Sequence, residues 1–112
     1  MTEKALENLF VREVRARGGI TYKFVSPGNI GVPDRIAVAP GGQVWFVELK
    51  TEIGRLSRMQ EYQLEKLRGM GCKVVVLYGR EEIMKTVASI STKRKEVVPN
   101  EVRTAWVPAI RR

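Results

Sequence analysis

The sequence predicts an α/β fold in which a mixed β-sheet is flanked by helices. Three observations lead to this prediction. The chain has 112 residues, a length that suits one compact domain. Its apolar share of 44% is that of a globular protein with a packed core. Segments with helical spacing of apolar residues alternate with short segments that have the pattern of strands.

The first predicted element is an amphipathic helix over residues 3–17. Apolar side chains recur at helical spacing from Leu6 to Val14, so they share one face. Thr2 is placed to act as the N-cap, and the glycine pair that begins at Gly18 ends the helix.

Three strands are predicted next. Residues 20–25 form the first strand, which the turn-rich loop 26–31 closes. Residues 35–39 form the second. The Pro-Gly-Gly sequence at 40–42 predicts a hairpin turn into the third strand, 43–50. The second and third strands are therefore expected to lie side by side.

Two helices and one strand complete the domain. Ser57 caps a helix that ends near Gly71. Residues 73–78 are a continuous apolar run, typical of a fully buried strand, and residues 80–91 form a third helix. The predicted order is αβββαβα, within a domain over residues 1–92.

Residues 93–112 form a basic C-terminal extension, either part of the same compact unit or a tail. It holds a basic cluster at 93–95 and Trp106. Three roles fit it: an arm that contacts DNA, a strand that joins two subunits, or a simple surface tail.

Composition narrows the chemistry. Twenty Lys and Arg against 12 Asp and Glu give a net charge of +8, which is typical of proteins that bind nucleic acid. The chain has no histidine, which excludes Ser-His-Asp and Cys-His catalysis, and its single cysteine, Cys72, can form neither an internal disulfide nor a zinc pair. Hydrolysis would therefore depend on carboxylates, lysine and a hard cation.

A charged pair ends the third strand. Glu48 and Lys50 are two residues apart, so their side chains point to the same face. Asp34 lies just before the second strand, and the hairpin brings it near Glu48. Two carboxylates beside a lysine suit Mg²⁺ or Mn²⁺, because such ions take carboxylate oxygens and keep positions open for water and phosphate.

This set of residues resembles the PD-(D/E)xK nuclease superfamily, with the motif written as Pro33-Asp34 and Glu48-Leu49-Lys50. Four segments are similar to those of a stand-alone virus-type replication-repair nuclease (VRR-NUC) domain: 23–28, 31–36, 46–50 and 56–60. The resemblance covers roughly residues 3–78. It implies a restriction-endonuclease-like fold and a metal-dependent endonuclease that hydrolyses phosphodiester bonds in DNA.

The resemblance implies a role for each matching residue. Asp34 and Glu48 would bind the metal ion, Mg²⁺ or Mn²⁺, together with the backbone carbonyl of Leu49. Lys50 would serve the attacking water. Gln60 matches the glutamine on the family's helix, and its alternative role is a hydrogen bond at the helix start.

The family also places a glutamate on the first helix, and Glu7 fits it. Glu7 shares a helical face with Phe10 and Val14. Periodicity alone leaves Glu3 and Glu13 as alternatives, and the family pattern favours Glu7.

Five residues close to the site in the sequence are candidate DNA contacts, although each basic one, taken singly, is more often a solvated charge. They are Lys23, Ser26, Arg35, Arg55 and Arg58. The glycine-rich loop 27–32 is either a wall along which backbone approaches the phosphodiester or a plain connection.

The resemblance implies cleavage of four-way (Holliday) junctions by a homodimer, in DNA repair. A chain of 112 residues offers little surface with which to recognise a branched substrate alone, which favours dimerisation. The alternatives are a nuclease directed at flaps or nicks and a non-catalytic nucleic-acid-binding module. With no signal peptide and no membrane-length apolar run, the expected location is the cytoplasm of a bacterium or a phage-infected cell.

Overall fold

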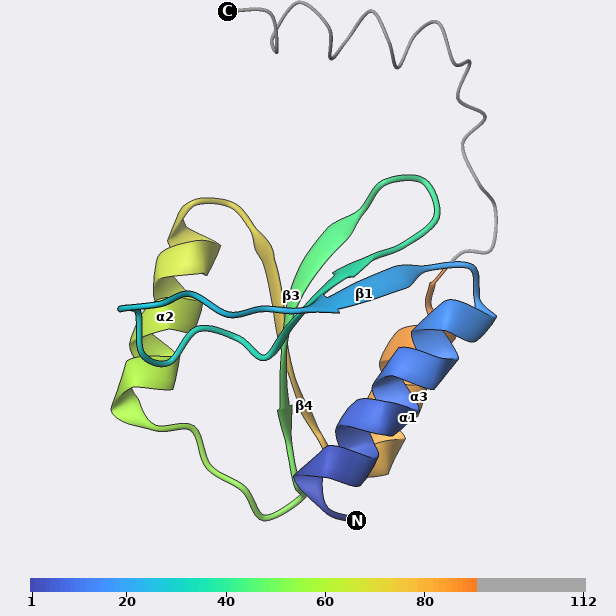
Figure 1. Cartoon of the computed structure of the whole chain (residues 1–112), viewed down its shortest axis with the longest axis horizontal. Coiled ribbons are helices and arrows are strands. Elements are labelled where there is room, and N and C mark those ends of the chain that lie inside the picture. The colour runs from blue at the N-terminus through green and yellow to red at the C-terminus, as the bar shows by residue number, and fades with distance from the viewer. Residues whose placement is uncertain (91–112) are drawn as a thin grey trace, which may run out of the picture.

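The computed structural model describes residues 1–90, whose arrangement is shown in Figure 1. Residues 91–112, and with them the predicted basic extension, lie outside the described part. Within residues 1–90, no helix has the length and apolar character needed to cross a membrane. The elements follow the predicted order: α1 (Glu3–Ala16), β1 (Ile20–Lys23), β2 (Arg35–Val38), β3 (Val44–Lys50), α2 (Arg58–Gly69), β4 (Lys73–Tyr78) and α3 (Gly79–Ala88).

The strands form one mixed sheet, as predicted, and their order in it is β1-β2-β3-β4. β1, β2 and β3 are antiparallel neighbours. At the hairpin between β2 and β3, the Ala39 N–H donates to the Gln43 carbonyl at 2.8 Å. β4 runs parallel to β3, with Val75 opposite Val47. A parallel pair needs a crossover connection, and α2 provides it.

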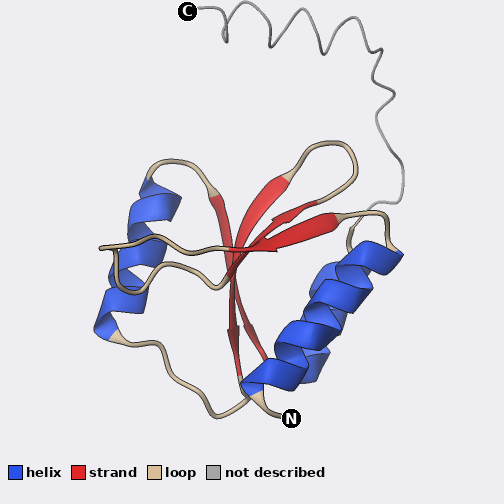
Figure 2. Cartoon of the chain, viewed as in Figure 1, coloured by secondary structure: helices blue, strands red, loops and turns tan. Residues whose placement is uncertain are grey.

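Helices cover both faces of the sheet, with α1 and α3 packed together on one face and α2 on the other (Figure 2). The main core lies under α1 and α3. Val47 and Leu49 point into it, so Glu48 between them points to the opposite face, toward α2. The helices contribute Leu6, Leu9, Phe10, Val14, Ile83 and Val87 to this core.

Both predicted N-caps are confirmed. The Thr2 hydroxyl accepts a hydrogen bond from the Ala5 N–H at 3.1 Å. Ser57 and Gln60 form a capping box: the Ser57 hydroxyl accepts from the Gln60 N–H at 3.1 Å, and the Gln60 side-chain oxygen accepts from the Ser57 N–H at 2.9 Å.

The first strand is shorter than the predicted 20–25, because β2 offers partners only from Arg35, which pairs with Lys23. One more backbone bond, from the Phe24 N–H to the Asp34 carbonyl at 2.8 Å, closes the ladder. The chain then turns away, and Val25 is 70% exposed. The other elements agree with the predicted ranges to within about three residues.

Candidate active site

The predicted site lies where β3 extends beyond β2. The first residue of β2, Arg35, pairs with Val47, so residues 48–50 have no β2 partner. The chain just before β2 takes the place of that strand, because Asp34 Oδ2 accepts a hydrogen bond from the Leu49 N–H at 3.0 Å. A backbone donor that would otherwise be unpaired thereby fixes the Asp34 carboxylate against the end of β3.

The same geometry directs the Leu49 carbonyl. In a strand, the N–H and C=O of one residue point toward the same neighbour. Because the Leu49 N–H points to Asp34, its carbonyl oxygen lies on that side too. Both residues line a hollow of about 260 Å³ at the start of α1. Two oxygen donors are thus brought to one side of β3.

Glu48 is 1% exposed and is held from two elements. Its Oε2 accepts a hydrogen bond from Gln60 Nε2 on α2 at 3.2 Å, and Lys50 Nζ lies 3.9 Å from the same oxygen. Its Oε1 is buried and has no hydrogen-bond partner among the described residues. A buried acceptor without a partner costs roughly 1–3 kcal/mol, and a carboxylate oxygen is the atom that a hard cation binds.

The surroundings of Glu48 raise its pKa from 4.5 to about 8. Burial is the largest cause, because the ionised carboxyl loses its hydration. Asp34 adds to the rise through its negative charge, and Glu3 contributes a smaller repulsion. Lys50 acts in the opposite direction. The metal-free protein therefore holds Glu48 largely protonated at neutral pH.

Gln60 performs both of the roles that the sequence left open for it. Its side-chain oxygen belongs to the capping box with Ser57, and its side-chain nitrogen donates to Glu48. The same residue that starts α2 therefore also orients the buried carboxyl.

The loop before β2 packs against the start of α2. Gly31 has a φ of +91°, and a Cβ there would lie 2.5 Å from the Met59 carbonyl carbon and 2.8 Å from the Gln60 nitrogen. Only glycine fits such an approach. Gly31 thus lets the loop support Gln60, whereas a Cβ on Gly28 would meet no atom of residues 1–90 within 4 Å. This contact gives the loop a structural role that its glycine content alone did not reveal.

The first-helix acids divide into two groups. Glu3 and Glu7 line the same hollow as Asp34. Glu13 does not, and its carboxylate contacts Arg17 at 2.9 Å and Arg12 at 3.4 Å. The structure therefore brings Glu3 and Glu7, rather than Glu13, to the site.

Arg35 occupies a different place from the predicted DNA contact. The whole residue is only 9% exposed. Its guanidinium donates to the Glu7 carboxylate at 2.9 Å and to the Thr21 hydroxyl at 3.0 Å. An arginine so engaged holds Glu7 in place and is not a free phosphate ligand. The sequence did not predict this network, because Thr21 and Glu7 lie in different elements from Arg35. The one hint in the sequence was Thr21 itself, a polar residue within a strand.

The other candidate DNA contacts differ in their surroundings. Lys23 is exposed and lines the hollow that contains Asp34. Arg55 and Arg58 are exposed in the loop before α2 and at its first residue. The Ser26 hydroxyl accepts from the Asn29 side chain at 2.8 Å, within a turn.

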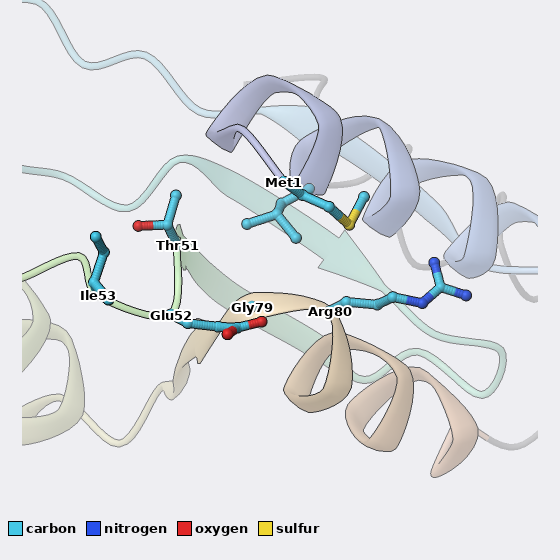
Figure 3. A pocket seen from close by; sticks show the side chains of 7 residues that line it. Met1, Thr51, Glu52, Ile53, Gly79 and Arg80 are labelled. Carbon is cyan, nitrogen blue, oxygen red and sulfur yellow. The ribbon is translucent and has the colours of Figure 1, made fainter.

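A second hollow, of about 430 Å³, lies between the starts of α1 and α3 and the loop after β3 (Figure 3). The Glu52 side chain lies against Gly79, which has a φ of +78° (Figure 3). Asp34, Glu48 and Lys50 are not among its lining residues. Of these two hollows, the smaller one is lined by Asp34 and Leu49.

Asp34, Glu48 and the Leu49 carbonyl fit a hard divalent cation. Asp34 and the Leu49 carbonyl offer oxygens on one side of β3, and Glu48 Oε1 is buried without a partner among the described residues. Residues 1–90 contain no cluster of three or more acidic, cysteine or histidine side chains that would form a closed cage. Mg²⁺ needs none, because it is usually bound through one or two carboxylates together with water and substrate phosphates.

Comparison with known proteins agrees with this fold. The model of the VRR-NUC domain family matches residues 4–81. A solved structure named "VRR_NUC domain" is 27% identical with a TM-score of 0.70, and covers 80% of this chain and 98% of that chain. Another, "VRR_NUC domain protein", is 15% identical with a TM-score of 0.64, covers 80% and 88% respectively, and bears on the fold alone.

A relative by sequence comes from the Acyrthosiphon pisum secondary endosymbiont phage 1 and is named "Putative nuclease p44". It is 44% identical over 75 residues, which cover 67% of this chain and 81% of the relative. The family match spans Asp34, Glu48, Lys50 and Gln60. The predicted resemblance is confirmed, and the chain belongs to the VRR-NUC domain family of nucleases.

Proposed function

We propose that this nuclease is a PD-(D/E)xK-type endonuclease that hydrolyses phosphodiester bonds in DNA with Mg²⁺ or Mn²⁺. The observation that carries the proposal is the convergence of Asp34 and Lys50 on the buried carboxyl of Glu48, one oxygen of which has no partner among the described residues. Placing the partly exposed carboxylate of Asp34 beside the buried carboxyl of Glu48 opposes stability unless a cation joins them.

Asp34, Glu48 and the Leu49 carbonyl would hold the cation. When bound, the ion supplies a water of lowered pKa and positive charge for the phosphate. Gln60 keeps Glu48 in orientation, and the Leu49 N–H does the same for Asp34. Glu7, fixed by Arg35, is the first-helix acid that we assign to the site.

Lys50 serves the nucleophile. Its ammonium donates to the attacking water or to the phosphate oxygen on which charge develops. The water forms a bond to phosphorus and passes a proton to the solvent. The bond from phosphorus to the leaving sugar oxygen breaks, and that oxygen takes up a proton from the solvent.

We further propose a homodimer that cuts four-way junctions. The resemblance to stand-alone VRR-NUC domains supports this substrate, and so does the small surface of one chain. Two sites related by two-fold symmetry would cut two strands of a symmetric junction.

The test is cleavage of a labelled synthetic four-way junction, with linear duplex and flap DNA as controls, in Mg²⁺, Mn²⁺ or EDTA. The Lys50→Ala variant is the matched control for the chemistry. The expected result is paired symmetric cuts that need both the metal and Lys50, from a protein that is dimeric in solution.

Each other result selects a different function. Cuts confined to flaps or nicks would keep the chemistry and refute the junction. Binding without cleavage of any substrate, unchanged by metal or by Asp34→Ala, would instead establish a nucleic-acid-binding module.

A further inference from the structure

A groove of about 490 Å³ runs along the exposed face of α1 beside the end of β1 and the start of β2. Basic side chains dominate its lining. Those of α1 are Lys4, Arg12 and Arg15, and those of the strands are Lys23 and Arg35. We call this surface the α1 groove. Spacings of three, four and eight residues along α1 place its lining residues on one helical stripe.

The α1 groove carries a net positive charge. Glu7 is its one acidic lining residue, and Arg35 neutralises it at 2.9 Å. Arg12 touches Glu13 at 3.4 Å, but Glu13 is held more closely by Arg17, at 2.9 Å, and the Arg12 side chain is 69% exposed. Lys4, Arg15 and Lys23 are also exposed. Four cations are therefore able to reach an anion laid in the groove.

The α1 groove is continuous with the candidate active site. Lys4, Glu7 and Lys23 line both the groove and the hollow that contains Asp34. From Lys4 to Arg15, α1 rises by about 16 Å, at about 1.5 Å per residue. That length corresponds to roughly five nucleotide steps along one strand of a duplex, at about 3.4 Å per step.

We propose that the α1 groove binds the phosphate backbone of the DNA strand that enters the active site, with Lys4, Arg12, Arg15 and Lys23 as its contacts. The proposal rests on the proposed function, because the shared lining residues direct the strand to Asp34. Two basic residues on the other helices are arranged differently. Lys66 lies over the Tyr62 ring and Lys85 pairs with Glu81, and neither lines a hollow shared with the site.

The test compares two variants for DNA binding and cleavage. Arg12→Ala/Arg15→Ala removes two contacts from the α1 groove, and Arg68→Ala, an exposed arginine on α2, is the control. Affinity for a fluorescent duplex is measured in a Lys50→Ala background at several salt concentrations, and kcat and KM in the active protein. All the changed arginines are exposed, so circular dichroism should show unchanged folding.

In the double variant, we expect affinity to fall by about tenfold or more, and the plot of log affinity against log salt to become shallower by about 2. KM should rise while kcat stays within about threefold. Replacing the phosphates two to five steps from the scissile bond with neutral methylphosphonates should weaken binding of the parent and not of the variant.

Three outcomes separate the two proposals. If the parent is active, and the double variant has the same DNA affinity and salt dependence as the Arg68→Ala control, the proposed role of the α1 groove is overturned and the proposed catalysis stands. An inactive parent whose DNA affinity still falls in the double variant supports the groove and overturns the proposed catalysis. If methylphosphonates weaken DNA binding equally in the parent and the double variant, the strand lies elsewhere, and the proposed role of the α1 groove is again overturned.

Discussion

Replacing Glu48 with glutamine should stabilise the metal-free protein at high pH while abolishing cleavage. The pKa of Glu48 is raised from 4.5 to about 8. An acid whose pKa is higher in the folded state stabilises the fold below its unfolded pKa, and this contribution is lost as the pH rises through the folded pKa. Between pH 5 and pH 9, the wild type should therefore lose stability that the variant retains.

The size of the effect follows from the pKa values. A tenfold change in an acid dissociation constant corresponds to about 1.4 kcal/mol, so ionising Glu48 in the folded state costs up to about 5 kcal/mol. Glutamine has nearly the same shape, carries no charge and can still bond to Gln60. Between pH 5 and pH 9, the free energy of unfolding of the wild type should therefore fall by several kcal/mol more than that of Glu48→Gln.

The assay is urea unfolding of both proteins at pH 5, 7 and 9, with EDTA or with Mg²⁺. Mg²⁺ should stabilise the wild type at pH 9 by favouring the ionised carboxyl, and it should not stabilise the variant. Parallel pH profiles for the two proteins in EDTA would refute the reasoning, because Glu48 would then titrate alike in the folded and unfolded states.

Three further predictions concern the supports of the site. Gly31→Ala should cost about 2 kcal/mol or more in urea unfolding, since its Cβ would collide with α2, whereas Gly28→Ala, with open space around it, should cost about 1 kcal/mol; equal losses would contradict the packing argument. Gln60→Glu should keep the capping box and leave the melting temperature within a few degrees, yet weaken Mg²⁺-dependent cleavage by about tenfold or more, because a second acid would face the buried carboxyl. Glu7→Gln should lower kcat by about tenfold or more, whereas Glu3→Gln should mainly move the pH–rate profile to lower pH by removing a repulsion; a profile unchanged by Glu3→Gln would refute this assignment.

Local patterns were sufficient to predict most of the fold and which residues lie together at the centre of the candidate site. The capping box at Ser57 and the hairpin glycines are readable because a few neighbouring residues determine them. Glu48 and Lys50 share a face through simple alternation. Asp34 could be placed near them because a short hairpin fixes which strands are adjacent.

Contacts between distant segments were the ones that the sequence did not reveal. Arg35 is basic and close to the motif, so it resembles a phosphate ligand until the fold places Glu7 and Thr21 around it. Gly31 belongs to a turn-rich loop, and only the packing of that loop on α2 shows why a side chain is excluded. Both cases depend on three-dimensional packing, which cannot be predicted from residue type and spacing alone.

The position of the site follows from one mismatch in strand length. Because β2 begins opposite Val47, the last three residues of β3 lose an antiparallel neighbour, and the backbone there must find other partners. Asp34 satisfies the Leu49 N–H, which brings a second acid beside Glu48 and raises the pKa of that buried carboxyl. A longer β2 would pair these backbone groups and be more stable, but it would leave no opening for a cation or a phosphate. The end of β3 that has no β2 partner is thus a local loss of stability that makes the proposed chemistry possible.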